Sequence, residues 1–274
     1  MRNFILRTLT GFAYVCLIVF CILMNSYTLL ALTVCLTIWA MIEFNSIHRK
    51  YARRPFLLLE DTVAILCGIS LSVAIFLFVN RLQFWGFAIF FILLCTRMII
   101  AIYSKGQSPL STLACSLASI LYIAVPLALL NWVRAITPHA VLAMFVLIWL
   151  NDTGAFLVGS LLGRHKMFPR ISPKKSWEGL VGGFAACLSA AIAIYILCPQ
   201  YFDTFTLTSF IGFGLITAAF ATWGDLMESL IKRTAGIKDS GTLLPGHGGI
   251  LDRIDSLLMV SPIIFAYMII LLEN

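Results

Sequence analysis

Long uninterrupted apolar runs constrain this chain more than any other feature of its sequence. Residues 62–79 and 110–132, for example, contain no charged side chain. Only 11% of the 274 residues are charged and the mean hydropathy is +1.00, whereas soluble domains carry roughly 25% charged residues. Because a bilayer-crossing helix needs about 20 apolar residues, the sequence predicts an all-α, polytopic integral membrane protein.

Nine segments are apolar on most faces and are bounded by charged residues, Pro or Asn, so each is expected to be a transmembrane helix. These segments are residues 8–25, 27–46, 62–79, 84–103, 110–132, 137–161, 178–198, 205–224 and 257–272. Cytoplasmic loops of membrane proteins collect Lys and Arg. Alternating the loops between the two sides places sixteen of the 19 basic residues on one side, which predicts a cytoplasmic N-terminus and an external C-terminus.

The formal net charge of +7 has a different meaning here than in a soluble domain. Basic loops of a membrane protein face anionic headgroups or anionic substrates, so we expect no nucleic-acid partner. The eight cysteines form no CxxC pair and lie in or beside apolar runs. We therefore expect neither disulfides nor zinc sites.

Polar chemistry is concentrated in two segments of the second half, residues 163–178 and 225–256. Both fall on the side predicted to be cytoplasmic. The sequence therefore favours a division into N-terminal transmembrane helices, residues 1–135, and a C-terminal transmembrane catalytic domain, residues 136–274, that carries both loops.

Acids at the ends of two predicted helices form the first candidate site. If the helix predicted over residues 205–224 continues past residue 224, Asp225, Ser229 and Lys232 lie on one of its faces. Asp252 and Asp255, three residues apart at the start of the last span, also share a face. Carboxylate and hydroxyl oxygens suit Mg²⁺, although acids at helix ends are also common as solubilising charge.

The segment between those helices is rich in glycine and surrounded by basic residues. Its glycines are Gly236, Gly241, Gly246, Gly248 and Gly249, and its basic neighbours are Lys232, Arg233, Lys238 and Arg253. Glycine lets backbone N–H groups approach a ligand, which predicts a phosphate site. A flexible hinge with a solvated basic face is the alternative. His247 lies among these glycines and is more consistent with a loop hydrogen bond than with a general base.

The other polar segment contains a basic turn, Ser172 to Trp177. Lys174, Lys175 and Ser176 could hold a triphosphate, while Trp177 could be an interfacial anchor. Asp152 interrupts a strongly apolar stretch, where an acid is costly and usually functional. Pairing with Arg97 is the structural alternative.

Taken together, these motifs resemble a known family. The residues from 229 to 255 carry a pattern whose fixed positions are Ser229, Lys232, Arg233, Lys238, Asp239, Gly241, Leu244, Pro245, His247, Gly248, Gly249, Ile250, Asp252, Arg253, Ile254 and Asp255. This pattern resembles the signature of the phosphatidate cytidylyltransferases without departure over its 27 positions. Asp152-Thr153-Gly154 and the residues 172–179 are similar to two further motifs of that family, whereas residues 1–135 match only as generic apolar helices.

The resemblance implies an enzyme that transfers CMP from CTP to phosphatidic acid, giving CDP-diacylglycerol and pyrophosphate. It implies Mg²⁺, paired with K⁺, held by Asp225 and Asp252, and a need for Ser229, Lys232, Arg233 and Asp255 in activity. The residues expected to bind substrate are Lys174, Lys175, Ser176, Lys238, Asp239, His247, Gly248, Gly249 and Arg253. It also implies a multi-pass, homodimeric protein of the inner (plasma) membrane, with a cytoplasmic active site among membrane lipids.

Two other functions remain open on the sequence. A related CTP-dependent nucleotidyltransferase or kinase acting on an isoprenoid lipid would use a similar inventory of residues. A transporter would use Arg97 and Asp152 as an intramembrane relay, although its polar groups would then gather at the midplane.

Overall fold

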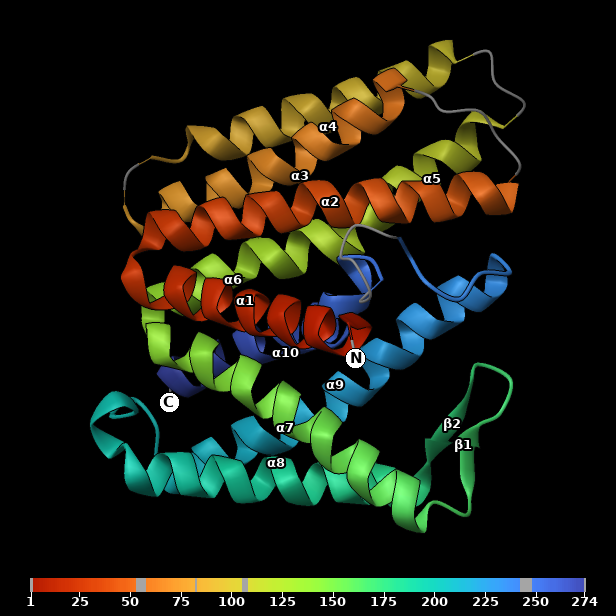
Figure 1. The fold of residues 1–274 in the computed structure, drawn as a ribbon. Helices are drawn as coiled ribbons and strands as arrows, with labels where there is room; N and C mark the ends of the chain where they lie inside the picture. Colours follow the sequence, from red (N-terminus) through yellow and green to blue (C-terminus); the bar gives the residue numbers. More distant parts are fainter. Residues whose placement is uncertain (1, 53–57, 82, 105–107, 242–247, 274) are drawn as a thin grey trace. The chain divides into compact units, whose positions relative to one another are not determined.

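The structure is a computed structural model that describes residues 2–52, 58–81, 83–104, 108–241 and 248–273, with side chains from residue 10 onward. Its helices are α1 (Arg2–Met24), α2 (Ser26–Ala52), α3 (Leu58–Val79), α4 (Trp85–Tyr103), α5 (Pro109–Ser119), α6 (Val125–Ile136), α7 (Pro138–Leu162), α8 (Trp177–Leu197), α9 (Leu207–Thr234) and α10 (Leu251–Glu273). The predicted all-α membrane class is confirmed (Figure 1).

Eight helices within the described residues are long and apolar enough to cross a bilayer. One of them is continuous from Pro109 to Ile136, because the π-helical turn η1 (Ile120–Ala124) joins α5 to α6. The Thr10–Met24 part of α1 is a shorter apolar helix. The count of nine spans and the orientation of the N-terminus therefore stay predictions.

Helix ends differ from the predicted segments where polar residues continue a helix. The eighth segment was expected to end at residue 224, but α9 runs to Thr234, and α10 begins at Leu251 instead of residue 257. Hydropathy detects only the part of a helix that matches the bilayer, whereas backbone hydrogen bonding continues into the polar turns. Because of these extensions, Asp225, Ser229 and Lys232 lie within α9, and Asp252 and Asp255 lie within α10.

The polar segment 163–178 is a β-hairpin, which the sequence analysis did not predict. Strands β1 (Lys166–Phe168) and β2 (Ser172–Ser176) pair antiparallel, with Lys166 opposite Ser176 and Phe168 opposite Ser172. The hairpin leads directly into α8. A short turn (η2, Pro199–Tyr201) follows α8.

The chain divides into two compact units. Unit 1 contains residues 1–136 and 234–253, and unit 2 contains residues 137–233 and 254–274. In unit 1, α3 packs against α2, α4 and α6, and in unit 2, α7 lies beside α8 (Figure 1). The glycine-rich segment after α9 is thus part of unit 1, although the sequence analysis grouped it with the C-terminal domain.

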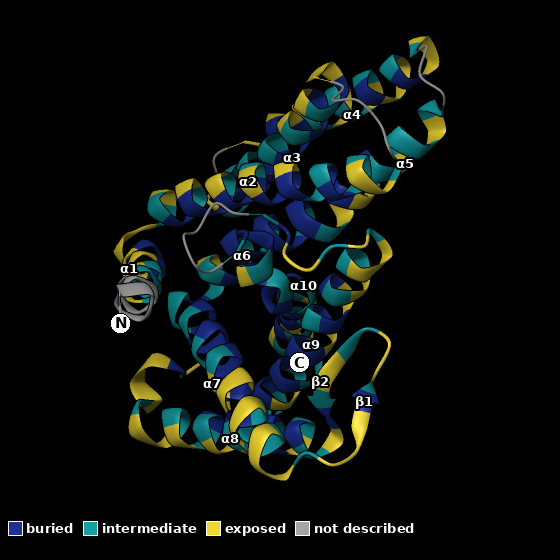
Figure 2. Ribbon diagram, turned by 45° about the vertical axis from the view of Figure 1, so that its right-hand side comes forward, coloured by how far each residue is buried: buried dark blue, intermediate teal, exposed yellow. Residues whose placement is uncertain are grey.

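Among the eight long apolar helices of the described residues, α4 is the least buried. Figure 2 colours most of α4 as exposed or intermediate, and only 17% of its apolar window is buried. Exposed side chains there include Phe91, Ile92 and Ile102. Such residues match lipid tails, which are as apolar as the side chains themselves.

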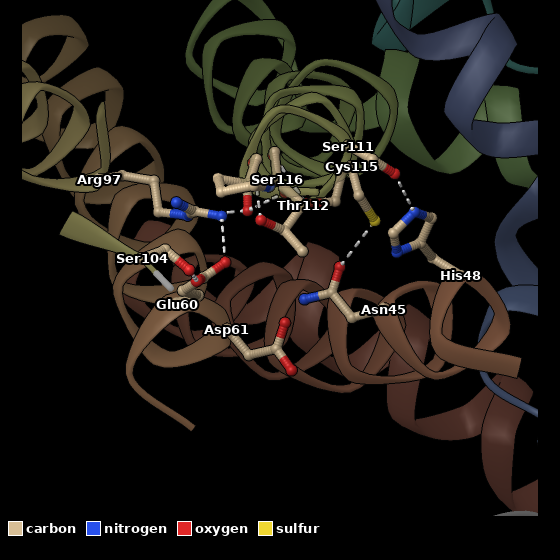
Figure 3. Close-up of polar contacts among 12 residues, drawn as sticks. Asn45, His48, Glu60, Asp61, Arg97, Ser104, Ser111, Thr112, Cys115 and Ser116 are labelled. Atoms are coloured by element: carbon tan, nitrogen blue, oxygen red, sulfur yellow. Dashed lines mark hydrogen bonds and ion pairs between the residues drawn. The ribbon is translucent and has the colours of Figure 1, made fainter. Parts of the chain in front are cut away.

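A buried ion pair organises the polar interior of unit 1 (Figure 3). Arg97 is 0% exposed; its Nη2 lies 2.9 Å from Glu60 Oε2 and its Nε donates to Ser116 Oγ at 2.9 Å. Ser104 Oγ donates to Glu60 Oε1 at 2.8 Å. Arg97 thus has a carboxylate partner, Glu60, within unit 1. The alternative that Arg97 pairs with Asp152, a residue of unit 2, stays a prediction.

Candidate functional site

The hairpin and α9 supply the first ion pair of the candidate site in unit 2. Lys175 Nζ lies 2.8 Å from Asp225 Oδ2, and it also donates to the carbonyl oxygen of Thr222 at 3.3 Å. Ser229 Oγ donates to Asp225 Oδ1 at 3.3 Å. The predicted shared face of Asp225 and Ser229 is confirmed, and the hairpin brings Lys175 to it.

Close approach of two helices places a second carboxylate beside Asp225. A Cβ on Gly224 would lie 2.6 Å from the carbonyl oxygen of Asp255 and 2.8 Å from Ser256 Cα. Only glycine therefore allows α9 and α10 to approach here. Asp255 Oδ1 accepts from the N–H of Ser256 at 2.7 Å.

Three carboxylates interact across this site. Asp152, exposed on α7, and Asp255, half-buried on α10, both feel the negative charge of Asp225. Lys175 supplies positive charge to Asp152, and Lys232 supplies positive charge to Asp255. Because carboxylates repel one another at short range, such a cluster is costly unless cations neutralise it. Asp152, which the sequence singled out as an acid in an apolar span, is thus part of the site.

The basic end of α9 is fixed by contacts that the sequence analysis did not foresee. Lys232 pairs with Glu228, which is buried one turn earlier on the same helix. Arg233 is exposed and its Nε donates to the carbonyl oxygen of Ile171 at 3.3 Å. Arg233 therefore ties the end of α9 to the hairpin, and the expected roles of Lys232 and Arg233 in activity stay predictions.

The hydroxyl of Ser176 caps a helix and is not exposed to solvent. It is 4% exposed, and its Oγ accepts from the N–H of Gly179 at 3.1 Å as the N-cap of α8. A side-chain cap satisfies an N–H group that the first turn of a helix leaves unpaired. Its expected contact with substrate stays a prediction.

The cap of α8 can be tested directly. We expect Ser176→Ala to lower the free energy of unfolding by about 1 kcal/mol, because the N–H of Gly179 loses its acceptor. Denaturant unfolding of the purified protein in detergent micelles measures this change. A rise in the KM for CTP at unchanged stability would instead support the role in substrate binding.

Asp252 belongs to unit 1, where its carboxylate closes a turn. Its Oδ2 accepts from the N–H of Ser240 at 3.0 Å, from Ser240 Oγ at 3.0 Å and from the N–H of Gly249 at 2.9 Å. Gly248 has a φ of +83°, and a Cβ there would lie 2.7 Å from Asp252 Oδ2. The expectation that Asp225 and Asp252 share a cation stays a prediction, because the two acids belong to different units.

Glu43 of α2 is the site residue that sequence reasoning missed. It is 7% exposed, and it accepts hydrogen bonds from the N–H groups of Ile250 (3.0 Å) and Leu251 (2.9 Å) and from Ser240 Oγ (2.9 Å). A signal existed, because Glu43 is one of three acids in the first half of the chain. Nothing in its spacing pointed to a partner about 200 residues away.

The other predicted substrate-binding residues lie on the surface. Lys174, Lys238, Asp239 and Arg253 are exposed. His247 lies outside the described residues. Their roles in binding CTP or lipid stay predictions.

The chemistry of the donor set fits Mg²⁺ held together with substrate. Within the described parts of the chain, no three carboxylate, imidazole or thiolate side chains converge closely enough to form a metal centre. Mg²⁺, however, is commonly bound through one or two carboxylates with phosphate oxygens and water completing its shell. Asp225, with Asp152 and Asp255 near it, offers oxygen donors of this kind.

These features define a class: a multi-pass membrane protein in which acidic and basic side chains from α7, α9, α10 and the hairpin gather in one site. The chain belongs to the Cytidylyltransferase family, whose sequence pattern matches residues 5–271.

Three relatives illustrate the similarity, and each is named as a phosphatidate cytidylyltransferase. That of Staphylococcus aureus (strain COL) is 40% identical over 165 residues, covering 60% of this chain and 62% of the relative. That of Staphylococcus saprophyticus is 39% identical over 187 residues, covering 68% and 69%. That of Haemophilus influenzae is 44% identical over 127 residues, covering 46% and 44%. The chain thus spans under two thirds of the length of the first of these relatives.

Proposed function

We propose that this protein is a phosphatidate cytidylyltransferase, which transfers CMP from CTP to phosphatidic acid and releases pyrophosphate. The observation that supports this most directly is the cluster of Asp225, Lys175 and Ser229, with Asp152 and Asp255 near it, in a member of the Cytidylyltransferase family. The names of the relatives support phosphatidic acid as the lipid.

The reaction asks for charge neutralisation more than for covalent chemistry. A phosphate oxygen of phosphatidic acid attacks the α-phosphorus of CTP, a new P–O bond forms, and pyrophosphate leaves in line. Both reactants are anions, so positioning and neutralisation dominate the barrier. A phosphate monoester is already ionised near pH 7, with a second pKa of about 6, so no general base is required.

Side chains of unit 2 can perform these tasks. Lys175 Nζ, 2.8 Å from Asp225, is placed to contact a nucleotide phosphate while its charge is partly balanced. Ser229 holds Asp225 in orientation through its hydrogen bond. Asp225 would hold Mg²⁺, which when bound supplies positive charge to the phosphate oxygens.

We also propose where the reaction takes place. CTP is dissolved in the cytoplasm, and the headgroup of phosphatidic acid lies at the membrane interface. A site at helix ends on the cytoplasmic face of the inner membrane, open to the bilayer, lets the two meet. The polar residues of α9 from Asp225 onward continue the helix past its apolar part, which supports a site near a membrane surface.

A direct assay separates this proposal from its alternatives. Purified protein with labelled CTP, Mg²⁺ and a panel of lipid phosphates and lipid alcohols should form CDP-diacylglycerol and pyrophosphate with phosphatidic acid only. Release of CDP with an isoprenoid alcohol would replace the proposal by a lipid kinase. Solute flux into liposomes without CTP turnover would favour a transporter.

Lys175 tests the nucleotide side of the proposal. We expect Lys175→Ala to raise the KM for CTP about tenfold, because a charge-assisted hydrogen bond to phosphate is worth roughly 1.5–3 kcal/mol. The KM for phosphatidic acid should change less. Steady-state kinetics in mixed micelles measure both constants, with exposed Lys166→Ala on the same hairpin as the matched control. A selective rise in the lipid KM would contradict this assignment.

A further inference from the structure

The beginning of α10 in unit 1 is built around a carboxylate that comes from α2. Glu43 Oε1 accepts from the N–H of Ile250, and Glu43 Oε2 accepts from the N–H of Leu251 and from Ser240 Oγ. The first N–H groups of a helix have no partner within the helix and carry partial positive charge. Glu43 therefore accepts hydrogen bonds from the two N–H groups at the start of α10, directly before Asp252.

The same serine connects Glu43 to Asp252. Ser240 Oγ lies 2.9 Å from Glu43 Oε2 and 3.0 Å from Asp252 Oδ2. Its hydroxyl has one proton, so it can donate to only one of these carboxylates at a time. The two acids are thus linked through one shared donor, and the position of one depends on the position of the other.

Glycines of the glycine-rich segment make room for Glu43. A Cβ on Gly241 would lie 2.5 Å from Glu43 Oε1, and a Cβ on Gly249 would collide with both Glu43 and Ser240 Oγ. At these two positions the absence of a side chain lets an internal carboxylate reach the backbone. This is a different use of glycine from the approach to phosphate that the sequence suggested.

Burial makes this arrangement energetically important. Glu43 is 7% exposed and Ser240 is 4% exposed. A buried carboxylate is strongly destabilising unless hydrogen bonds satisfy it, and removing its partners leaves donors unpaired. Three hydrogen bonds, two of them from a helix N-terminus, offset that cost here.

We infer that Glu43 is a positioning residue: it holds Ser240 and the Gly248–Asp252 turn so that the Asp252 carboxylate is presented in a fixed orientation. This rests on the proposed function and on the sequence prediction that Asp252 is a cation ligand. Glu43 thereby acts on Asp252 from the first half of the chain, although the resemblance to the family gave residues 1–135 no site residue.

Glu43→Gln is the variant that tests this inference. Glutamine keeps the size of glutamate but has a single acceptor oxygen, so its NH₂ group faces another donor. We expect amide hydrogen exchange in peptides covering residues 248–252 to become at least about tenfold faster, since about 1.4 kcal/mol corresponds to a factor of ten. Unchanged exchange there would overturn the inference whatever the activity proves to be.

A functional readout separates positioning from general destabilisation. The Mg²⁺ concentration for half-maximal turnover should rise about tenfold in Glu43→Gln, as for loss of a group that orients a metal ligand. The matched control is Asp61→Asn, which removes another unit 1 carboxylate, one that is paired with Arg49. An equal rise in the control would overturn the inference.

A double-mutant cycle shows whether Glu43 acts through Ser240. The changes in exchange and in Mg²⁺ requirement for Glu43→Gln combined with Ser240→Ala should be about those of the larger single change. Fully additive changes would overturn the shared network. If the unmodified protein shows no Mg²⁺-dependent turnover of CTP, the proposed function fails, and the exchange data still decide the inference.

Discussion

Asp225→Asn should lower kcat by at least about a hundredfold, because it removes the negative charge that is proposed to hold Mg²⁺ and that interacts with the other charged groups of the unit 2 site. Asp225 pairs with Lys175, accepts from Ser229 and interacts with Asp152 and Asp255. Loss of one preorganised electrostatic group costs roughly 10²–10³ in rate. The measurement is CDP-diacylglycerol formation at saturating CTP and Mg²⁺.

Stability should change little in the same variant. The Asp225 side chain is 39% exposed, and partly exposed ion pairs are worth about 1 kcal/mol or less. Asp203→Asn is the matched control, because Asp203 is an exposed acid of the same unit that lies outside the site. A rate near that of the unmodified protein in Asp225→Asn, or an equal loss in Asp203→Asn, would show that the cation site is elsewhere.

The fold was largely predictable because the bilayer imposes it. Backbone groups in lipid must be satisfied within a helix, so apolar runs such as residues 62–79 become helices with little ambiguity. The polar ends were harder. Whether α9 would continue to Thr234 depended on helical hydrogen bonding that hydropathy does not report, and the hairpin at 166–176 has no strong alternation of apolar and polar residues.

Local spacing predicted the contacts within one helix but not those between elements. Ser229 contacts Asp225 because residues four apart share a helix face. Lys175 was predicted to bind phosphate, and its pairing with Asp225 of α9 became visible only in the fold. Glu43 and Ser240 are 197 residues apart, a separation at which periodicity carries no information.

The position of Asp252 suggests that this acid has two separable tasks. Its Oδ2 closes the turn with Ser240 and Gly249, which is a matter of accepting hydrogen bonds. Binding a cation is a matter of negative charge. A substitution that keeps the acceptor and removes the charge can therefore distinguish the structural task from the proposed functional one.

Asp252→Asn is that substitution, and we expect it to lower turnover by about a hundredfold or more while the turn stays folded. The asparagine oxygen can occupy the place of Oδ2 and accept from the N–H groups of Ser240 and Gly249, so the free energy of unfolding should change by no more than about 1 kcal/mol. The side chain then has no charge with which to hold Mg²⁺.

Asp252→Ala provides the contrast, since alanine removes the acceptor as well as the charge. Both variants should lose turnover, but only alanine should speed amide exchange at Gly249 and lower stability, because it leaves buried donors unpaired. Denaturant unfolding, exchange and CDP-diacylglycerol formation on the two variants decide the matter. Normal turnover in Asp252→Asn would reduce Asp252 to a structural cap and remove it from the proposed cation ligands.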